Sequence, residues 1–197
     1  MKEQFEGLIQ SYIEQQVGID QHFLSEKLAI GLRENILQLQ LEELMKPAGI
    51  GNQLIKDDQQ QFRGDQIYWL DKSHDNAFEQ EFLAQIDALV VYLNETCYAG
   101  IQHTEFHYAV YEKGKAYQKH IDQFKNDDDR QFSLVCYLNT NWEEEEGGQL
   151  WLHHANYIQK IFPQQRTAVF FKSNEMEHEV RVATRDRMSI TGWLKRG

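Results

Sequence analysis

Two histidines and one aspartate are the first residues in this sequence whose types and spacing could do chemistry. His120 and Asp122 stand two residues apart at a predicted strand end, and His178 lies in a later segment of similar character. Because residues i and i+2 of a strand share a face, His120 and Asp122 can both turn toward one point. Taken alone, such a pair is more often a hydrogen-bonded structural pair, so His178 matters as a third candidate ligand.

The metal that this ligand set suits is non-haem iron. Two imidazoles and one carboxylate form the facial triad that holds Fe(II) and leaves coordination positions open for oxygen chemistry. Structural zinc would need four closed and usually sulfur-containing ligands. The chain has two cysteines, Cys97 and Cys136, without the paired spacing of a zinc site. We expect both to be reduced, buried thiols.

Arg187 is the next candidate, because it follows His178 by nine residues and opens a predicted strand. The residues that share its face of this strand are Ser189, Thr191 and Trp193. We expect this face to look inward. An unpaired buried charge costs several kcal/mol, so an arginine inside a barrel needs an anionic partner. A ligand carboxylate would satisfy it through two parallel hydrogen bonds.

The elements that position these residues change in type near residue 101. Before it, apolar residues recur at helical intervals over 3–17, 20–45 and 76–95, which predicts three amphipathic helices. Asp20 is the predicted N-cap of the second helix, and Pro47 is expected to stop it. Residues 59–64 are expected to form a polar loop, and residues 66–70 a short strand.

After residue 101 the chain is rich in β-branched and aromatic residues separated by polar turns, which predicts a sandwich, barrel or jelly roll. The predicted strands are 105–112, 116–121, 131–139, 148–153, 157–161, 167–171, 177–182 and 187–194. We expect one domain over residues 1–197, mainly helical in its first 60 residues and with its β core over 100–197.

Charge and composition narrow the classes of partner. The 197 residues carry a formal net charge of −11, which disfavours nucleic acid and anionic membrane surfaces. Hydrophobic residues make up 41%, enough for a core. The N-terminal segment lacks the apolar stretch of a signal peptide, and the longest apolar run, at 88–93, is far shorter than a membrane span. We therefore expect a cytoplasmic protein.

The spacing of His120, Asp122, His178 and Arg187 resembles that of the Fe(II)- and 2-oxoglutarate-dependent dioxygenases, in particular their prolyl 4-hydroxylase branch. Residues 63–70 resemble the Arg-Gly-Asp-x-Ile-x-Trp stretch of the oxygen-sensing prolyl hydroxylases. Residues 137–142 and 147–150 resemble two further strands of that branch, and 178–193 resembles its last segment. The resemblance covers about 63–194 and is strongest from 108 onward.

This resemblance implies an α+β fold with a double-stranded β-helix (jelly-roll) core and supporting N-terminal helices. It implies that Fe(II) is held by His120, Asp122 and His178. It also implies co-substrate contacts from Arg187, which would grip the distal carboxylate of 2-oxoglutarate, and from Tyr137, Tyr111 and Thr191. The turn between Tyr111 and His120 is one residue shorter than in the animal enzymes.

The reaction implied is hydroxylation of a prolyl residue in a protein, with O2 consumed, succinate and CO2 released, and ascorbate a candidate reductant. Bacterial relatives in this branch act on a prolyl residue of elongation factor Tu, which makes that protein a candidate substrate. A polypeptide partner is therefore expected, and nucleic acid and membrane partners are not. Monomer and homodimer both stay open.

Two other functions stay open. A hydroxylase of a free amino acid or another small molecule would carry the same catalytic set, and a jelly-roll protein that only binds a ligand or partner is the non-enzymatic alternative. A nucleic-acid demethylase is disfavoured by the nine-residue spacing from His178 to Arg187 and by the net charge of −11.

Other polar residues are given no part in the site. The histidines expected to be structural or on the surface are His22, His74, His103, His107, His153 and His154. The acidic runs at 127–129 and 143–146 lie between predicted strands, and they would form a negative rim if their loops border the iron site.

Overall fold

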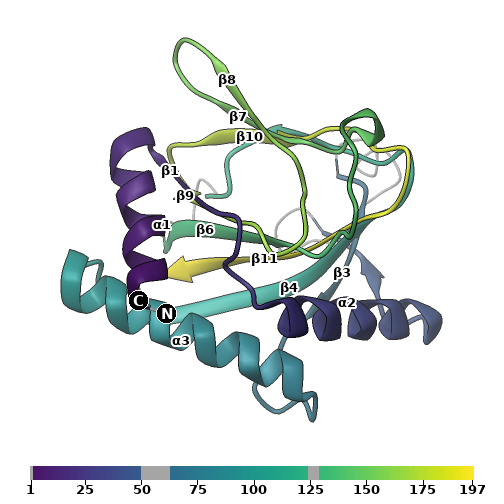
Figure 1. Ribbon diagram of the computed structural model, residues 1–197, viewed down its shortest axis with the longest axis horizontal. Helices are drawn as coiled ribbons and strands as arrows, with labels where there is room; N and C mark the ends of the chain where they lie inside the picture. The colour runs from purple at the N-terminus through teal and green to yellow at the C-terminus, as the bar shows by residue number, and fades with distance from the viewer. Residues whose placement is uncertain (1, 50–62, 124–128) are drawn as a thin grey trace.

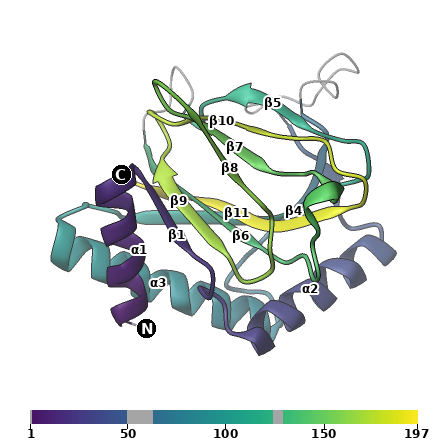
Figure 2. The same cartoon turned by 45° about the horizontal axis from the view of Figure 1, so that its top comes forward.

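Two antiparallel sheets face each other, and helices cover the outer side of the larger one (Figure 1). The computed structural model describes residues 2–49, 63–123 and 129–197. The turned view in Figure 2 shows the same layers, with the smaller sheet on the side away from the helices. This arrangement is the predicted α+β fold with a jelly-roll core.

The larger sheet has the strand order β1-β9-β6-β11-β4-β3-β2. Its strands are β1 (Val17–Asp20), β2 (Lys46–Pro47), β3 (Asp65–Trp69), β4 (His103–Tyr111), β6 (Arg130–Tyr137), β9 (Ala168–Lys172) and β11 (Arg187–Lys195). The smaller sheet has the order β5-β10-β7-β8. Its strands are β5 (Tyr117–His120), β7 (Leu150–His153), β8 (Ile158–Ile161) and β10 (Glu177–Val180). All eight strands predicted after residue 101 are confirmed, and so is the short strand before it.

The helices are α1 (Lys2–Gln15), α2 (Glu26–Leu41), α3 (Ala77–Cys97) and the short 3-10 helix η2 (Glu144–Glu146). Among the described residues, no helix has the length and apolar character that crossing a membrane requires. Both cysteines are free thiols. The prediction that both are buried is wrong for Cys97, which is exposed at the end of α3.

The sequence pattern misplaced the start of α2. Asp20 was expected to cap it, but Asp20 ends β1 and Ser25 is the cap, its Oγ accepting a hydrogen bond from the Leu28 N–H at 3.1 Å. β1 pairs with β9 at the edge of the larger sheet. That long-range pairing keeps residues 17–20 extended, although the helical pattern predicted that one helix ends at 17 and the next begins at 20.

The end of α2 also differs from the expectation. The helix stops at Leu41, before Pro47, and Pro47 belongs to β2 at the other edge of the sheet. A proline is tolerated there because an edge strand can do without one N–H donor. Most of the polar loop predicted at 59–64 lies outside the described residues.

Strand alternation divides the buried side chains into two cores. One lies between the helices and the larger sheet and takes Leu134, Cys136 and Ile190 from the strands. The other lies between the two sheets and includes Val135 and Tyr137. Alternate residues of β6 and β11 thus face opposite layers, and the functional side chains are on the face between the sheets.

Candidate metal centre

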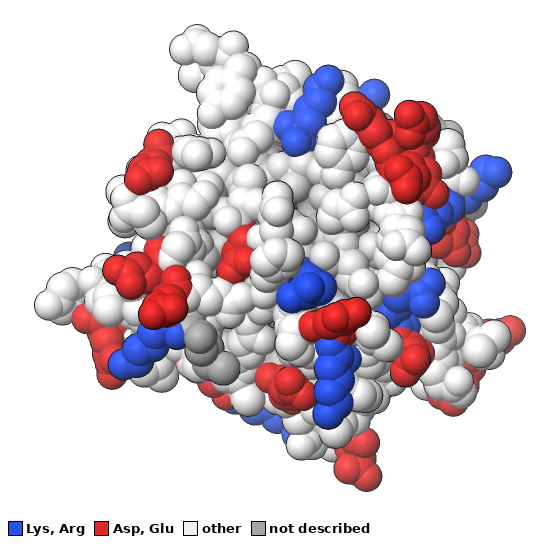
Figure 3. All heavy atoms as spheres, in the orientation of Figure 1, with Lys and Arg blue, Asp and Glu red and all other residues white. Residues whose placement is uncertain are grey.

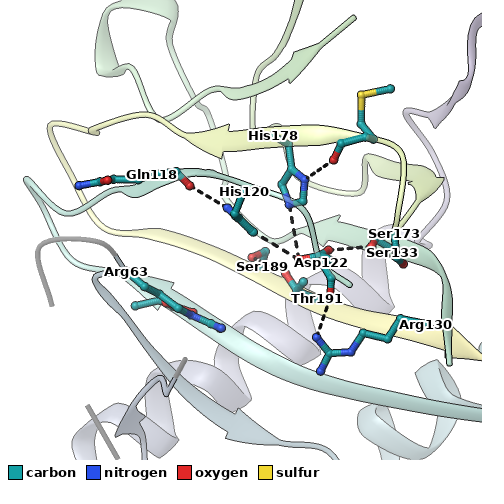
Figure 4. A network of polar contacts seen from close by, with 12 residues as sticks. Arg63, Gln118, His120, Asp122, Arg130, Ser133, Ser173, His178, Ser189 and Thr191 are labelled. Carbon is teal, nitrogen blue, oxygen red and sulfur yellow. Dashed lines mark hydrogen bonds and ion pairs between the residues drawn. The ribbon is translucent and has the colours of Figure 1, made fainter. Parts of the chain in front are cut away.

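His120, Asp122 and His178 meet between the two sheets, near one end of the smaller one (Figure 4). β10 pairs with β5 so that His178 stands directly opposite His120. Asp122 follows β5 by two residues, and its Oδ1 lies 3.4 Å from His120 Nε2 and 3.6 Å from His178 Nε2. Within the described ranges, this is the group of three His, Cys, Asp or Glu residues that could hold a metal ion.

Both imidazole rings are held with the same nitrogen toward Asp122. Nδ1 of His120 lies 2.7 Å from the Gln118 carbonyl, and Nδ1 of His178 lies 3.0 Å from the Met176 carbonyl. A carbonyl oxygen only accepts, so each Nδ1 carries the proton and each Nε2 is the free ligand atom. Burial also lowers the pKa of His178 to about 4. The ring is therefore neutral near pH 7, as metal ligation requires.

The Asp122 carboxylate is buried and ionised. Burial alone would raise its pKa, but His178, His120 and a hydrogen bond from Ser133 together hold the pKa of Asp122 well below its usual range. Two imidazole Nε2 atoms and one carboxylate directed at one point fit Fe(II) in a facial triad. The residues present therefore suit the metal that the sequence led us to expect.

Arg187 lies inside the barrel with 2% of its surface exposed. Its Nε donates a hydrogen bond to the Gly148 carbonyl at 2.9 Å, and no acidic side chain of the described residues forms an ion pair with it. Gly148 has a φ of +69°, and a Cβ at this position would lie 2.9 Å from the Trp142 ring. Only a glycine allows the backbone to pass this close to Trp142 in this conformation. The guanidinium is thus held in place by its Nε, and its two Nη groups form no ion pair with an acidic side chain of the described residues.

Two tyrosines pack beside this guanidinium. Its carbon lies 5.0 Å from the centre of the Tyr137 ring and 5.4 Å from that of Tyr111. The Tyr137 hydroxyl is buried and makes no hydrogen bond to any described residue. Burial raises the pKa of Tyr137 although Arg187 opposes the shift, so this hydroxyl stays a neutral donor. A buried cation beside an orphaned donor fits a carboxylate ligand such as that of 2-oxoglutarate.

One cavity joins the three candidate metal ligands to Arg187. Of the seven predicted site residues, six line it: Tyr111, His120, Asp122, His178, Arg187 and Thr191. Tyr137 is not in this lining, and its ring face packs against the Arg187 guanidinium. The expectation that Arg187, Thr191 and Trp193 look inward along β11 is confirmed, since all three line this cavity.

The cavity wall contains residues that sequence reasoning left out of the site. His107 was expected to be only structural or on the surface, but it is buried and lines the cavity. Its ring stacks on Trp69 and on Trp193, with ring centres 4.9 and 5.5 Å away and the two indoles 6.4 Å from each other, and its Nδ1–H donates to the Thr191 carbonyl at 2.7 Å. Alternation from Tyr111 along β4 was the signal that could have placed His107 on the inner face.

Arg63 and Asp65 are also part of this wall. Arg63 donates from Nε and Nη2 to the two carboxylate oxygens of Asp65, at 2.7 and 3.0 Å. Sequence similarity marked this stretch, but it gave neither residue a role. The other five histidines in the group set aside lie outside the cavity, as expected.

The second acidic run, at 143–146, forms η2 and its N-cap and lies close to the segments that carry Gly148 and Arg185. Gly148, which accepts the Arg187 hydrogen bond, comes two residues after η2, and Arg185 pairs with Glu146 at 2.7 Å. Figure 3 shows acidic side chains gathered over the corner of the molecule where η2 lies in Figure 1. Residues 127 and 128 of the first acidic run lie outside the described residues.

Comparison with known proteins places this architecture in a family. Residues 106–195 match the family model of the 2OG-Fe(II) oxygenase superfamily. The crystal structure of a Pseudomonas putida prolyl-4-hydroxylase is similar over 98% of this chain and 99% of its own, with a TM-score of 0.88 and 31% sequence identity. The chain belongs to the 2OG-Fe(II) oxygenase superfamily.

Within this superfamily, the chain lies in the prolyl hydroxylase branch. Human prolyl hydroxylase EGLN3 is 26% identical over 180 residues, which cover 87% of this chain and 75% of the human protein. A prolyl hydroxylase from Trichoplax adhaerens, solved with a hypoxia inducible factor peptide fragment, shares the fold with a TM-score of 0.88 and 24% identity, over 98% of this chain and 90% of its own. The protein is thus a 2-oxoglutarate-dependent dioxygenase of the prolyl hydroxylase type, and its family implies Fe(II), 2-oxoglutarate and O2.

Proposed function

We propose that this oxygenase hydroxylates a prolyl residue of a polypeptide, with Fe(II) held by His120, Asp122 and His178 and 2-oxoglutarate held by Arg187. The observation that supports it best is the single cavity that joins these three ligands to a buried guanidinium without an acidic partner. Bound Fe(II) and 2-oxoglutarate would supply the oxidation, in which one oxygen atom of O2 enters the substrate and the other enters succinate as CO2 is lost.

The protein's own part begins with ligation and orientation. The backbone carbonyls that accept from His120 and His178 keep each Nε2 directed at the metal position. At the other end of the cavity, Arg187 would bind the distal carboxylate of 2-oxoglutarate, and the Tyr137 hydroxyl would donate to the same carboxylate. These contacts would hold the oxo acid end of the co-substrate toward the metal.

Two further residues line the space between the two ends. Burial raises the pKa of Tyr111 well above its usual value, so its hydroxyl would donate a hydrogen bond rather than carry a charge. Thr191 adds a second hydroxyl to the same wall. The apolar side chains of Val135, Leu150 and Val180 also line the cavity and would limit the entry of water.

An aromatic series at the cavity supports a prolyl substrate. The rings of Trp69, His107 and Trp193 pack together in one group, in which Trp69 is 46% exposed. Aromatic side chains commonly line the grooves that take proline-rich segments, because the extended proline backbone packs flat against them. The prolyl hydroxylase branch of the family points the same way. Elongation factor Tu is our candidate substrate, on the resemblance to bacterial members of the branch, and the cytoplasm is the proposed compartment.

The proposal is tested with a synthetic peptide from a candidate protein, Fe(II), 2-oxoglutarate and ascorbate under air. We expect a peptide product heavier by one oxygen atom, with the added oxygen on proline, and an equal amount of succinate. The matched peptide with alanine in place of that proline should stay unmodified, and the Asp122→Ala enzyme should give no product. Oxidation of free proline with no oxidation of any peptide would replace the proposal by the small-molecule alternative.

A further inference from the structure

The outer oxygen of the Asp122 carboxylate is held by a pair of buried serines that the proposed mechanism does not use. Ser133 Oγ donates a hydrogen bond to Asp122 Oδ2 at 2.7 Å, and Ser173 Oγ lies 2.9 Å from Ser133 Oγ (Figure 4). Neither serine has any exposed surface. The two carboxylate oxygens are therefore in different surroundings, since Oδ1 faces the two imidazoles.

The direction of the hydrogen bonds follows from the number of protons. The Ser133 hydroxyl has one proton, which it donates to Asp122 Oδ2. Its contact with Ser173 must then be one in which Ser133 accepts, so Ser173 donates its own proton to Ser133. The result is a one-way chain from Ser173 through Ser133 to the carboxylate. Successive bonds in such a chain strengthen one another.

The backbone holds this chain in place at two neighbouring strands of the larger sheet. Ser133 lies on β6 in the larger sheet, and Ser173 directly follows β9, the neighbouring strand. The Asp122 N–H donates to the Ser173 carbonyl at 3.0 Å, and the Ser173 N–H donates to the Gln131 carbonyl at 3.1 Å. The backbone of Asp122 is thus hydrogen-bonded to Ser173, the residue at which the hydroxyl chain begins.

We propose that Ser133, supported by Ser173, is a positioning residue that keeps Asp122 Oδ2 away from the metal and makes Asp122 a ligand through Oδ1 alone. This inference rests on the proposed role of Asp122 as a ligand. A carboxylate that binds through both oxygens would occupy a second coordination position, and a carboxylate without a fixed outer oxygen would rotate. The serine pair prevents both and keeps positions open for 2-oxoglutarate and O2.

The test measures metal binding without turnover. Mn(II) is titrated into the metal-free protein, and free Mn(II) is followed by its electron paramagnetic resonance signal. Removing a hydrogen-bond partner of a metal ligand typically lowers metal affinity about 10–100-fold, which is the loss we expect for Ser133→Ala. Ser133→Thr retains the hydroxyl and should bind Mn(II) as the wild type does. Ser173→Ala should cause a smaller loss.

Two further variants make the measurement specific. In the Ser133→Ala background, Ser173→Ala should cause no additional loss, because Ser173 acts only through Ser133. The matched control is Ser11→Ala. The Ser11 hydroxyl also makes two hydrogen bonds, to the Val17 carbonyl at 3.1 Å and from the Ile19 N–H at 3.3 Å, but it lies on α1 away from the site. Its variant should bind Mn(II) normally.

The outcomes separate this inference from the proposed function. If Asp122→Ala binds Mn(II) as tightly as the wild type, the ligand assignment itself fails. If Asp122→Ala loses binding while Ser133→Ala keeps wild-type affinity, or gains affinity, the serine pair has no positioning role. If Ser133→Ala does not fold, the other two variants test the proposal. Ser173→Ala must then bind Mn(II) more weakly than the wild type, and Ser133→Thr must bind it as the wild type does. Any other result overturns the proposal.

Discussion

The Tyr117 ring lies flat against the imidazole of His120, with ring centres 3.6 Å apart and planes 17° apart. The Arg63 guanidinium lies on Tyr117 at 5.0 Å from the ring centre. The candidate metal ligand on β5 is therefore covered by an aromatic ring, which is itself held by an arginine paired with Asp65. This relationship joins the stretch at 63–65, which the sequence marked only by similarity, to the metal centre.

Removing the Tyr117 ring should speed the dissociation of a metal ion bound by His120. We expect Tyr117→Ala to release Mn(II) to a chelator about three- to tenfold faster than the wild type, because a stacked aromatic pair contributes about 0.5–1.5 kcal/mol. Tyr117→Phe keeps the ring and should release Mn(II) at the wild-type rate. Equal release from the alanine and phenylalanine variants would show that the stacking has no part in holding His120.

Removing the Arg187 guanidinium should remove the anchor for 2-oxoglutarate. We expect Arg187→Gln to weaken binding of 2-oxoglutarate by at least about 30-fold, since truncating one partner of a buried charge pair costs about 2–5 kcal/mol. The measurement is an anaerobic titration of Fe(II) and 2-oxoglutarate, followed by the visible charge-transfer band. Mn(II) affinity without co-substrate serves as the control and should not change. Unaltered affinity for 2-oxoglutarate would contradict the role given to Arg187.

The same residue should lower the stability of the ligand-free fold. Arg187 is buried without an acidic partner in the described part of the chain, and hydrophobic residues that replace buried charges are often neutral or stabilising. The metal-free Arg187→Met protein should therefore unfold at the same urea concentration as the wild type or at a higher one. A clear decrease in the unfolding midpoint would mean that the Gly148 hydrogen bond and the tyrosine contacts outweigh the cost of burying the charge.

Acid should destabilise the fold through His107. Burial, followed by the nearby Arg63, lowers the pKa of His107 from 6.5 to about 4. Between these values the unfolded chain binds a proton that the folded protein does not, so the free energy of unfolding falls as the pH is lowered from about 6.5 to about 4. The shift of about 2.5 pH units corresponds to a contribution on the order of 3 kcal/mol.

The variant His107→Gln has no titrating ring at this position and should weaken this pH dependence, while the part due to His178, whose pKa burial also lowers to about 4, remains. Urea unfolding of the metal-free wild type and variant, at a series of pH values between 4 and 7, checks the prediction. Parallel curves for the two proteins would show that His107 is not the group responsible.

Trp69 should contribute to binding of the polypeptide substrate and not to binding of 2-oxoglutarate. We expect Trp69→Ala to raise the KM for the peptide about fivefold or more, as truncation of an aromatic contact residue typically costs 1 kcal/mol or more. Its affinity for 2-oxoglutarate, measured anaerobically, should equal that of the wild type. A KM unchanged for the peptide would remove the aromatic series from the proposed binding surface.

Strand alternation predicted much of the site because it depends only on neighbours along the chain. Residues two apart share a face, so the inward direction of Arg187, Thr191 and Trp193 followed from the sequence, and the structure places all three in the cavity wall. The two-residue spacing of His120 and Asp122 likewise predicted, from neighbouring positions alone, that their side chains can point the same way. What the sequence could not supply was the distance to His178, since that residue reaches His120 through pairing of β10 with β5.

The residues that were misjudged are those whose surroundings come from distant segments. Asp20 failed as a helix cap because β1 pairs with β9, about 150 residues away. His107 looked like an isolated histidine, but β3 and β11, the two neighbours of its strand, each bring a tryptophan ring against it. The amino-acid sequence by itself determined most of the helices and strands, the inward faces of the strands that carry the site, and the chemistry of the ligand set. Only the tertiary structure decided which faces meet, because contacts between strands depend on pairing and packing over long separations that local periodicity does not record.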